Sequence, residues 1–150
     1  MKQFLLAGKE KEKEFIKLFE GAKNSSKRQD MSEHWDVSVP VKFDVKSQKR
    51  VWRRDAEKSS KYNWIELKNV KGHKGWLYGK ADFFAFEVDD NWIIVDKIKL
   101  QEFVESLPLT PWDKVDVPLY QIYQRRGRKD ELTLVKNMDL IRISETIMQK

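Results

Sequence analysis

The feature that most constrains the fold is the strict alternation of residue character over residues 34–47, HWDVSVPVKFDVKS. Apolar residues take one parity and polar residues take the other, which is typical of β-structure with one buried face. Pro40 lies midway between Asp36 and Asp44, where proline favours a turn over a continued strand. The segment therefore predicts a hairpin in which the two aspartates stand opposite each other.

Facing carboxylates need a compensating positive charge. Directly paired residues on neighbouring strands have Cβ atoms about 4.5–5.5 Å apart, and two carboxylates that close repel each other. A divalent cation would relieve this repulsion, and Lys46 has the same parity as Asp44. Two acids and a lysine gathered around a metal are the working parts of a nuclease. The polar face of a solvated hairpin would look similar in a chain that is 36% charged, so that interpretation stays open.

Length and composition indicate one folded domain over residues 1–150. The chain is 40% hydrophobic, with eight Phe, six Trp and four Tyr, which argues against intrinsic disorder. No apolar run approaches the roughly 18–20 residues of a membrane span, and the N-terminus lacks the apolar region of a signal peptide. The absence of cysteine excludes disulfides and argues against a zinc site. A cytoplasmic protein without a membrane partner is the simplest expectation.

The net charge of +6 is unevenly distributed. Residues 49–80 carry +7 and residues 81–116 carry −6. Basic residues follow the Asp44-Val45-Lys46 triplet and are interleaved with Trp52, Tyr62 and Trp64, while a second group lies near the C-terminus. Grouped basic charge suits a phosphate backbone, although a solubilising surface would look the same. The candidate nucleic-acid-binding residues are Lys49, Arg50, Arg53, Arg54, Lys58 and Lys61 in the first group, and Arg125, Arg126, Arg128 and Lys129 in the second.

The remaining pattern predicts an α+β fold: a mixed β-sheet with a leading N-terminal helix and flanking helices. We expect the first helix over residues 9–20, ended by Gly21, with Glu12 near the middle of its apolar face. A role for Glu12 in the site and a place at a frayed first turn both stay open. A polar linker follows at 23–30. The other expected elements are strands at 61–70, 81–88 and 92–96, a helix at 99–106, a surface connection at 108–118, strands at 119–124 and 132–136 forming a basic C-terminal hairpin (about 118–137), and an amphipathic end at 138–148.

The order of these features resembles the PD-(D/E)xK nuclease superfamily, which has the restriction-endonuclease-like fold. A helix with an inward acid, Glu12, precedes a strand aspartate, Asp36, and then a strand with Asp44-x-Lys46. The opening GKEKEKEFIKLFE, followed about two dozen residues later by the strand aspartate, is similar to Holliday-junction resolvases of that superfamily. The resemblance covers roughly residues 8–50. The later segment WIELKNVKGHKGWLYGKADFFAFE resembles small phage-encoded proteins.

The resemblance implies a Mg²⁺- or Mn²⁺-dependent endonuclease that hydrolyses phosphodiester bonds of DNA, with RNA not excluded. In that family Asp36 and Asp44 would hold the metal, helped by the Val45 carbonyl and by Glu12. Lys46 would assist the attacking water, and Gln48 would contact the same phosphate or water. The chain departs from the family pattern in the short interval between Asp36 and Asp44, and no helix is evident after the D-x-K strand.

Alternatives remain at both the site and the function. Glu66-x-Lys68 also fits the (D/E)-x-K pattern, and in that version Asp44 is the first acid and Asp36 is a bystander. A catalytically inactive nucleic-acid-binding module of the same fold and a host-interaction protein are the other functional interpretations. The sequence leaves monomer and homodimer open.

Overall fold

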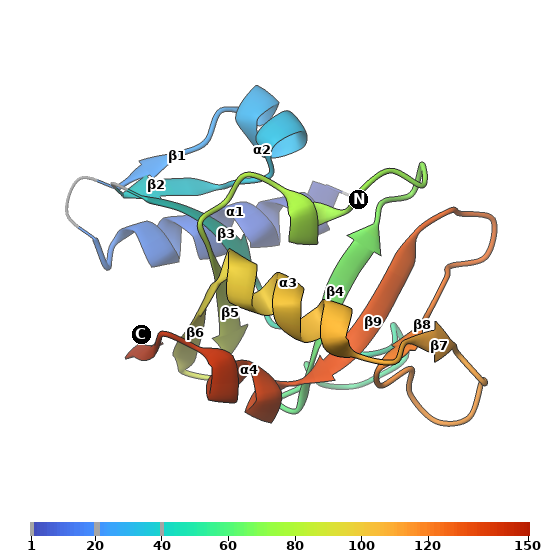
Figure 1. Ribbon diagram of the computed structural model, residues 1–150. Coiled ribbons are helices and arrows are strands. Elements are labelled where there is room, and N and C mark those ends of the chain that lie inside the picture. The colour runs from blue at the N-terminus through green and yellow to red at the C-terminus, as the bar shows by residue number, and fades with distance from the viewer. Residues whose placement is uncertain (1, 20–21, 40) are drawn as a thin grey trace. The chain divides into compact units, whose positions relative to one another are not determined.

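The computed structural model describes residues 2–19, 22–39 and 41–150. Within them the fold is mixed α+β, with a mixed sheet and four α-helices (Figure 1). Contacts divide the chain into two compact units, and neither is continuous in sequence. Unit 1 comprises residues 1–47, 80–97 and 144–150, and unit 2 comprises residues 48–79 and 98–143.

The described residues of unit 1 form a six-stranded sheet with the order β1-β2-β3-β5-β6-β10. Only β3 and β5 are parallel, and the other neighbours are antiparallel. The strands expected at 81–88 and 92–96 are confirmed as the β5–β6 hairpin. The strand bounds are β1 (Lys23–Asn24), β2 (Val37–Val39), β3 (Val41–Lys46), β5 (Phe83–Val88), β6 (Asn91–Asp96) and β10 (Thr146–Gln149).

Helix α1 (Lys2–Ile16) lies against this sheet and closes the core of unit 1 (Figure 1). Phe15 is fully buried, and its ring centroid lies 5.1 Å from that of Trp92 and 5.2 Å from that of Phe43. Glu12 falls on the same stripe because residues three apart share a helix face, and it is only 8% exposed. The helix begins earlier and ends earlier than expected at 9–20. The expected stop, Gly21, lies outside the described residues.

Residues 23–30 are more ordered than the expected polar linker. They contain β1 and the start of helix α2 (Lys27–Glu33). Ser26 forms a capping box, accepting from the Gln29 N–H at 3.2 Å while Gln29 Oε1 accepts from the Ser26 N–H at 3.0 Å. This S-x-x-Q signature was present in the sequence. The expectation of a linker was wrong because α2 has no buried face to give a hydrophobic period.

Unit 2 is built on β4 (Tyr62–Lys68) and β9 (Glu131–Lys136), which pair antiparallel. The strand expected at 61–70 is therefore confirmed, followed by the 3₁₀ turn η1 (Trp76–Tyr78). A Cβ on Gly75 would lie 2.5 Å from the Glu66 carbonyl oxygen, so glycine is needed for this close approach. Helix α3 (Lys97–Ser106) enters unit 2 at residue 98, and α4 (Asn137–Ile143) follows β9.

Two expectations near the C-terminus hold only in part. The strand expected at 119–124 shortens to β8 (Gln121–Ile122), which pairs in parallel with β7 (Thr110–Pro111). The expected pairing with β9 is kept at Tyr123 and Leu132, whose N–H groups each donate to the other's carbonyl, at 2.7 and 2.9 Å, whereas the bridge of Leu119 with Leu134 is parallel and does not extend the hairpin. The amphipathic end at 138–148 divides into α4 and the edge strand β10.

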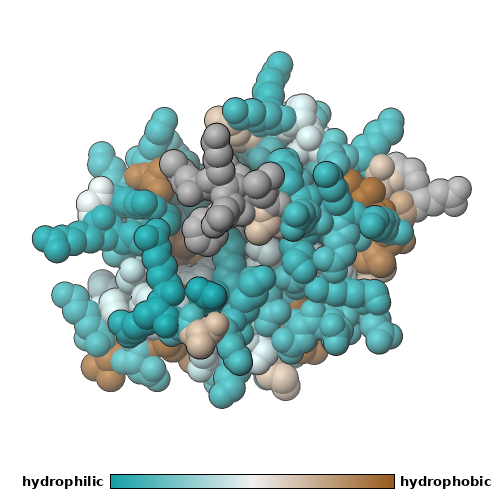
Figure 2. All heavy atoms as spheres, turned by 180° about the vertical axis from the view of Figure 1, so that it is seen from behind, coloured by the Kyte–Doolittle hydropathy of each residue, from teal (hydrophilic) through white to brown (hydrophobic). Residues whose placement is uncertain are grey.

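None of the described helices has the length and apolar character that a membrane crossing requires. Figure 2 shows a mainly hydrophilic surface on the face it draws, with apolar residues in scattered small groups. This agrees with a chain in which 36% of the residues are charged.

Candidate active site

The β2–β3 hairpin brings Asp36 and Asp44 close together. Its register pairs Val37 with Phe43 and Val39 with Val41, so Asp36 directly precedes the paired residues and Asp44 directly follows them. The Asp36 N–H donates to the Phe43 carbonyl at 3.0 Å, which is one residue off the register of the ladder, so Asp36 and Asp44 are neighbours at its end but are not a regular cross-strand pair. Pro40 itself lies outside the described residues, but the pairing on either side of it confirms the predicted hairpin.

Both aspartates are buried, and each has a partner. Asp36 is 7% exposed, and its Oδ2 accepts from the Val45 N–H at 2.9 Å. Asp44 is 3% exposed, and its Oδ1 lies 2.7 Å from Lys46 Nζ. The lysine side chain keeps 20% of its surface exposed, so it links the buried acid to the surface of unit 1. The sequence-predicted trio is therefore brought together.

Asp36 and Asp44 are two like charges in a buried environment, which changes the pKa of Asp36. Burial and the neighbouring charge of Asp44 raise the pKa of Asp36 to about 8, against an ordinary value of 3.8. Lys46 and the Val45 N–H oppose this rise because they favour the ionised carboxylate. Near neutral pH Asp36 is therefore protonated, and this proton relieves the repulsion between the two carboxylates when no cation is bound.

Glu12 lies within electrostatic reach of the pair but has its own partner. Its Oε2 is 3.2 Å from Lys9 Nζ. Burial raises the pKa of Glu12, the ion pair with Lys9 lowers it, and the charges of Asp30 and Asp44 raise it further. Its burial confirms the inward position predicted from the helical stripe.

The described residues contain no group of three or more Asp, Glu or His side chains placed to hold a metal ion. Glu12 is not part of such a group, because side chains of β3 point alternately to its two faces. Phe43 and Val45 pack into the core with α1, so Asp44 and Lys46 point to the opposite face of the strand. Glu12 belongs to the helix side, and the structure does not gather it with the two aspartates into one three-acid group.

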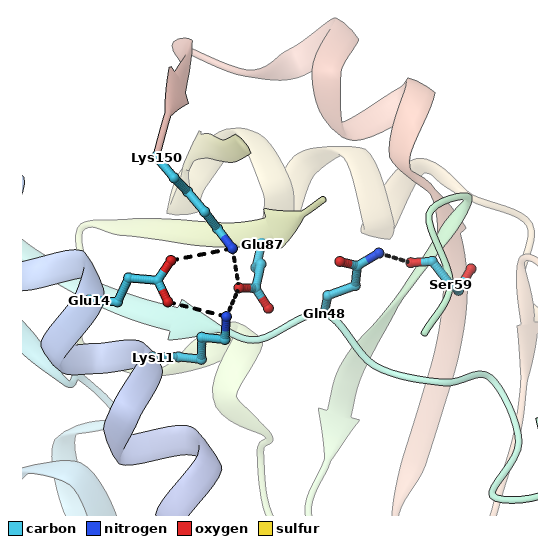
Figure 3. A network of polar contacts seen from close by, with 6 residues as sticks. All are labelled: Lys11, Glu14, Gln48, Ser59, Glu87 and Lys150. Atoms are coloured by element: carbon cyan, nitrogen blue, oxygen red, sulfur yellow. Dashed lines mark hydrogen bonds and ion pairs between the residues drawn. The ribbon is translucent and has the colours of Figure 1, made fainter. Parts of the chain in front are cut away.

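Gln48 takes part in a different contact from the one expected for it. It is buried, and its Nε2 donates to the Ser59 carbonyl at 2.9 Å (Figure 3). The Ser59 N–H in turn donates to the Lys49 carbonyl at 2.8 Å. Gln48 therefore closes the base of the basic loop that contains residues 49–58.

The competing pair, Glu66 and Lys68, lies on β4 of unit 2. Glu66 Oε1 accepts from the Trp76 N–H at 3.1 Å, and Lys68 Nζ lies 3.0 Å from Glu131. The register of β4 against β9 shifts between Glu66 and Lys68, which disturbs the two-residue spacing that a (D/E)-x-K pair needs. Both side chains already have partners within unit 2.

The basic candidates all fall in unit 2, and most are exposed. In the first group Lys49, Arg50, Arg53, Arg54, Lys58 and Lys61 are exposed, and in the second Arg126, Arg128 and Lys129 are exposed. Arg125 differs because its Nε contacts Asp130, which is fully buried. Arg125 therefore holds the turn together.

Sequence reasoning missed a buried ion cluster in unit 1. Glu87, at 2% exposure, lies 2.6 Å from Lys11 Nζ and 2.7 Å from Lys150 Nζ, and Glu14 contacts both lysines (Figure 3). The parity of the apolar strand ADFFAFEV placed an acid on a buried face, and that was the available signal. Its partners come from distant parts of the chain, so no local pattern could name them.

Comparisons with protein-family models, with curated proteins and with solved structures found no match for this chain.

Proposed function

We propose that the protein is a metal-dependent nuclease of the PD-(D/E)xK type that acts on DNA, with unit 1 as the catalytic core. The observation that carries the proposal is the buried pair Asp36 and Asp44, neighbours at the end of the β2–β3 hairpin, with Lys46 at 2.7 Å from Asp44. The helix-then-hairpin order and the mixed sheet of unit 1 are compatible with a restriction-endonuclease-like fold.

The donor set fits a hard divalent cation. Mg²⁺ binds through one or two carboxylates and keeps several waters, so Asp36, Asp44 and the Val45 carbonyl suffice without a third acid. The raised pKa of Asp36 supports this fit because a cation between the carboxylates would offset their repulsion. Such a metal, when bound, would stabilise negative charge on the scissile phosphate.

Lys46 is positioned to orient the attacking water. Its ammonium is half-buried and held by Asp44, so it can donate a hydrogen bond to a water or phosphate oxygen next to the acids. Asp36, held by the Val45 N–H, fixes the other side of the site. Glu12 adds negative charge from α1 without a direct contact to the pair in the structure.

The test is cleavage of labelled DNA as linear duplex, single strand and four-way junction, with Mg²⁺ or Mn²⁺ and with chelator. We expect metal-dependent cleavage that Asp44→Asn abolishes, because the substitution removes a charged metal ligand. Asp90→Asn, in the exposed β5–β6 turn, is the matched control and should retain activity. Thermal unfolding supplies a second readout: Mg²⁺ should raise the melting temperature of the unsubstituted protein and of Asp90→Asn but not of Asp44→Asn.

The two lysine assignments separate in the same assay. Lys46→Ala should lower the cleavage rate by about 10²–10⁴-fold, the usual contribution of a positioned proton-transfer group, with little loss of DNA affinity. Lys68→Ala should leave the rate within a few fold because Lys68 pairs with Glu131. The reverse pattern would favour Glu66-x-Lys68 over Asp44-x-Lys46 as the catalytic motif.

A second candidate is a nucleic-acid-binding module that has lost catalysis. The observation that favours it is that the described residues hold no three-acid group for a metal, while Lys46 is already paired with Asp44. DNA binding with no cleavage under any metal, and no metal-dependent rise in melting temperature, would decide for this candidate.

A further inference from the structure

Unit 2 contains a cluster of aromatic rings that the proposed chemistry does not use. We call Trp52, Trp64, Trp112 and Tyr123 the aromatic cluster. Five pairs of these rings have centroids between 5.4 and 6.1 Å apart. The four residues come from the basic loop, from β4, from the segment after β7 and from the segment after β8, so the cluster exists only in the folded unit.

The aromatic cluster differs from the buried core of the same unit. Ile65, Leu77 and Leu134 are fully buried, whereas all four rings are half-buried and keep part of their surface in solvent. The indole N–H of Trp112 is buried with no hydrogen-bond partner among the described residues. An unpaired buried donor is costly, so the cluster is not arranged to satisfy all of its own polar groups.

One positive charge lies beside the cluster, and further basic residues lie on the same loop. The Arg54 guanidinium lies 5.9 Å from the centroid of the Trp52 ring. Arg50, Arg53 and Lys58 are exposed on the same loop. Asp55 accepts from the Trp52 N–H at 2.9 Å, and the Gln48–Ser59 contact closes the base of the loop. Arg54 is thus beside the Trp52 ring, and the other basic side chains are exposed on the same anchored loop.

We propose that the aromatic cluster and the basic loop form a binding surface for single-stranded DNA, with unpaired bases stacking on the exposed ring faces and phosphates contacting the arginines. Every base has a flat π-face, and a stacking platform beside basic side chains is the general chemistry of single-strand binding. A duplex keeps its bases stacked on each other and does not present them to the rings. The choice of DNA over RNA rests on the proposed function, whereas the stacking itself needs no chemistry from unit 1.

The experiment measures binding of fluorescein-labelled oligo(dT) to the full chain by anisotropy in chelator, so that cleavage cannot occur. Tryptophan fluorescence quenching is followed in parallel. We expect oligo(dT) to bind more tightly than a duplex of equal nucleotide content, and to quench tryptophan emission. Trp52→Ala should weaken binding roughly 5- to 150-fold, the range for the loss of one base–aromatic stack, and Trp52→Phe should restore most of it.

Two control variants show whether a loss of binding is specific to the proposed surface. Lys71→Gln removes one exposed charge of unit 2 outside the loop and should change binding less than Arg54→Gln does. Asp90→Asn, outside both the aromatic cluster and the aspartate pair, should bind oligo(dT) as the unsubstituted protein does, and the measurement in chelator separates the loss of binding from the loss of cleavage. If Trp52→Ala unfolds, the comparison of oligo(dT) with duplex and the Arg54→Gln variant still decide.

Three outcomes would overturn the inference. The first is that the duplex binds as tightly as oligo(dT) or more tightly. The second is that a folded Trp52→Ala variant binds oligo(dT) as tightly as the unsubstituted protein. The third is that oligo(U) binds more tightly than oligo(dT). The last would reassign the surface to RNA.

Discussion

At the scale of single residues, the burial of Asp36 and Asp44 sets how the protein responds to pH. The folded protein keeps a proton on Asp36 up to about pH 8, whereas an unfolded chain releases it near pH 3.8. The folded state therefore binds more protons than the unfolded state between these limits. The contribution of Asp36 to stability is complete below pH 3.8 and is lost as pH rises through 8.

We predict that Asp36→Asn removes this pH dependence. In metal-free buffer the free energy of unfolding of the unsubstituted protein should fall, relative to the variant, by up to about 1.4 kcal/mol per pH unit between about pH 4 and 8. Urea unfolding of both proteins across this range measures the difference, with Asp90→Asn as the control for an exposed aspartate. Parallel curves for Asp36→Asn and the unsubstituted protein would show that the proton is not on this residue.

At the scale of elements, α1 is attached to the sheet both through its aromatic stripe and through a buried charge. Phe15 fills the core, and Lys11 reaches Glu87 at the end of β5. Glu12, between these contacts, is held in its inward position by both. The ion cluster of Lys11, Glu14, Glu87 and Lys150 therefore fixes the helix that brings Glu12 near the aspartates (Figure 3).

Replacing Glu87 should therefore destabilise unit 1. Glu87→Gln removes two charge-assisted contacts from a side chain that is 2% exposed, and we expect a total decrease in stability of about 1.5–3 kcal/mol. The full 3–5 kcal/mol of a broken buried pair is not expected, because Lys11 and Lys150 keep 28% and 21% of their side chains exposed and can be hydrated.

Urea unfolding monitored by circular dichroism tests this expectation. Glu10→Gln, at an exposed position on the same helix, is the matched control and should stay within about 0.5 kcal/mol of the unsubstituted protein. A Glu87→Gln variant as stable as the control would mean that the cluster contributes no net stability.

At the scale of the whole molecule, the two units differ in charge. Unit 1 has 13 basic and 14 acidic residues, and unit 2 has 17 basic and 10 acidic residues. The net positive charge of the chain therefore belongs to unit 2. The proposed chemistry lies in the nearly neutral unit, and the proposed attraction of phosphate lies in the basic one.

We predict that the basic turn at residues 126–129 also contributes to the binding of DNA phosphates. Replacing Arg126, Arg128 and Lys129 with serine should weaken DNA binding similarly for different sequences, because phosphate contacts carry no sequence information. The slope of log K against log salt should flatten by up to about 0.9 for each phosphate that the variant no longer binds on duplex DNA, or by about 0.7 on a single strand. Arg125 is kept because it holds buried Asp130.

The control removes equal charge elsewhere in unit 2, through serine at Lys71, Lys99 and Lys136. Titrations at several salt concentrations compare the two triple variants. Equal slopes in both would assign the turn to general solubility, and leave the basic loop as the remaining candidate for phosphate binding.

Local pattern alone determined the candidate site. Alternation and Pro40 act over neighbouring residues, so the sequence was sufficient to predict the β2–β3 hairpin and the closeness of Asp36 and Asp44. The regular cross-strand pair expected of them is not formed, because the ladder ends at Val37 and Phe43. The inward position of Glu12 followed equally from the helical period of α1.

Tertiary structure decided what depends on distant partners. The pairing of β4 with β9, the attachment of β10 to β6 and the meeting of Trp52 with Trp112 each join segments far apart in sequence. The same holds for the pKa of Asp36, because its largest cause is burial, and burial is produced by the whole of unit 1 rather than by the residues beside it.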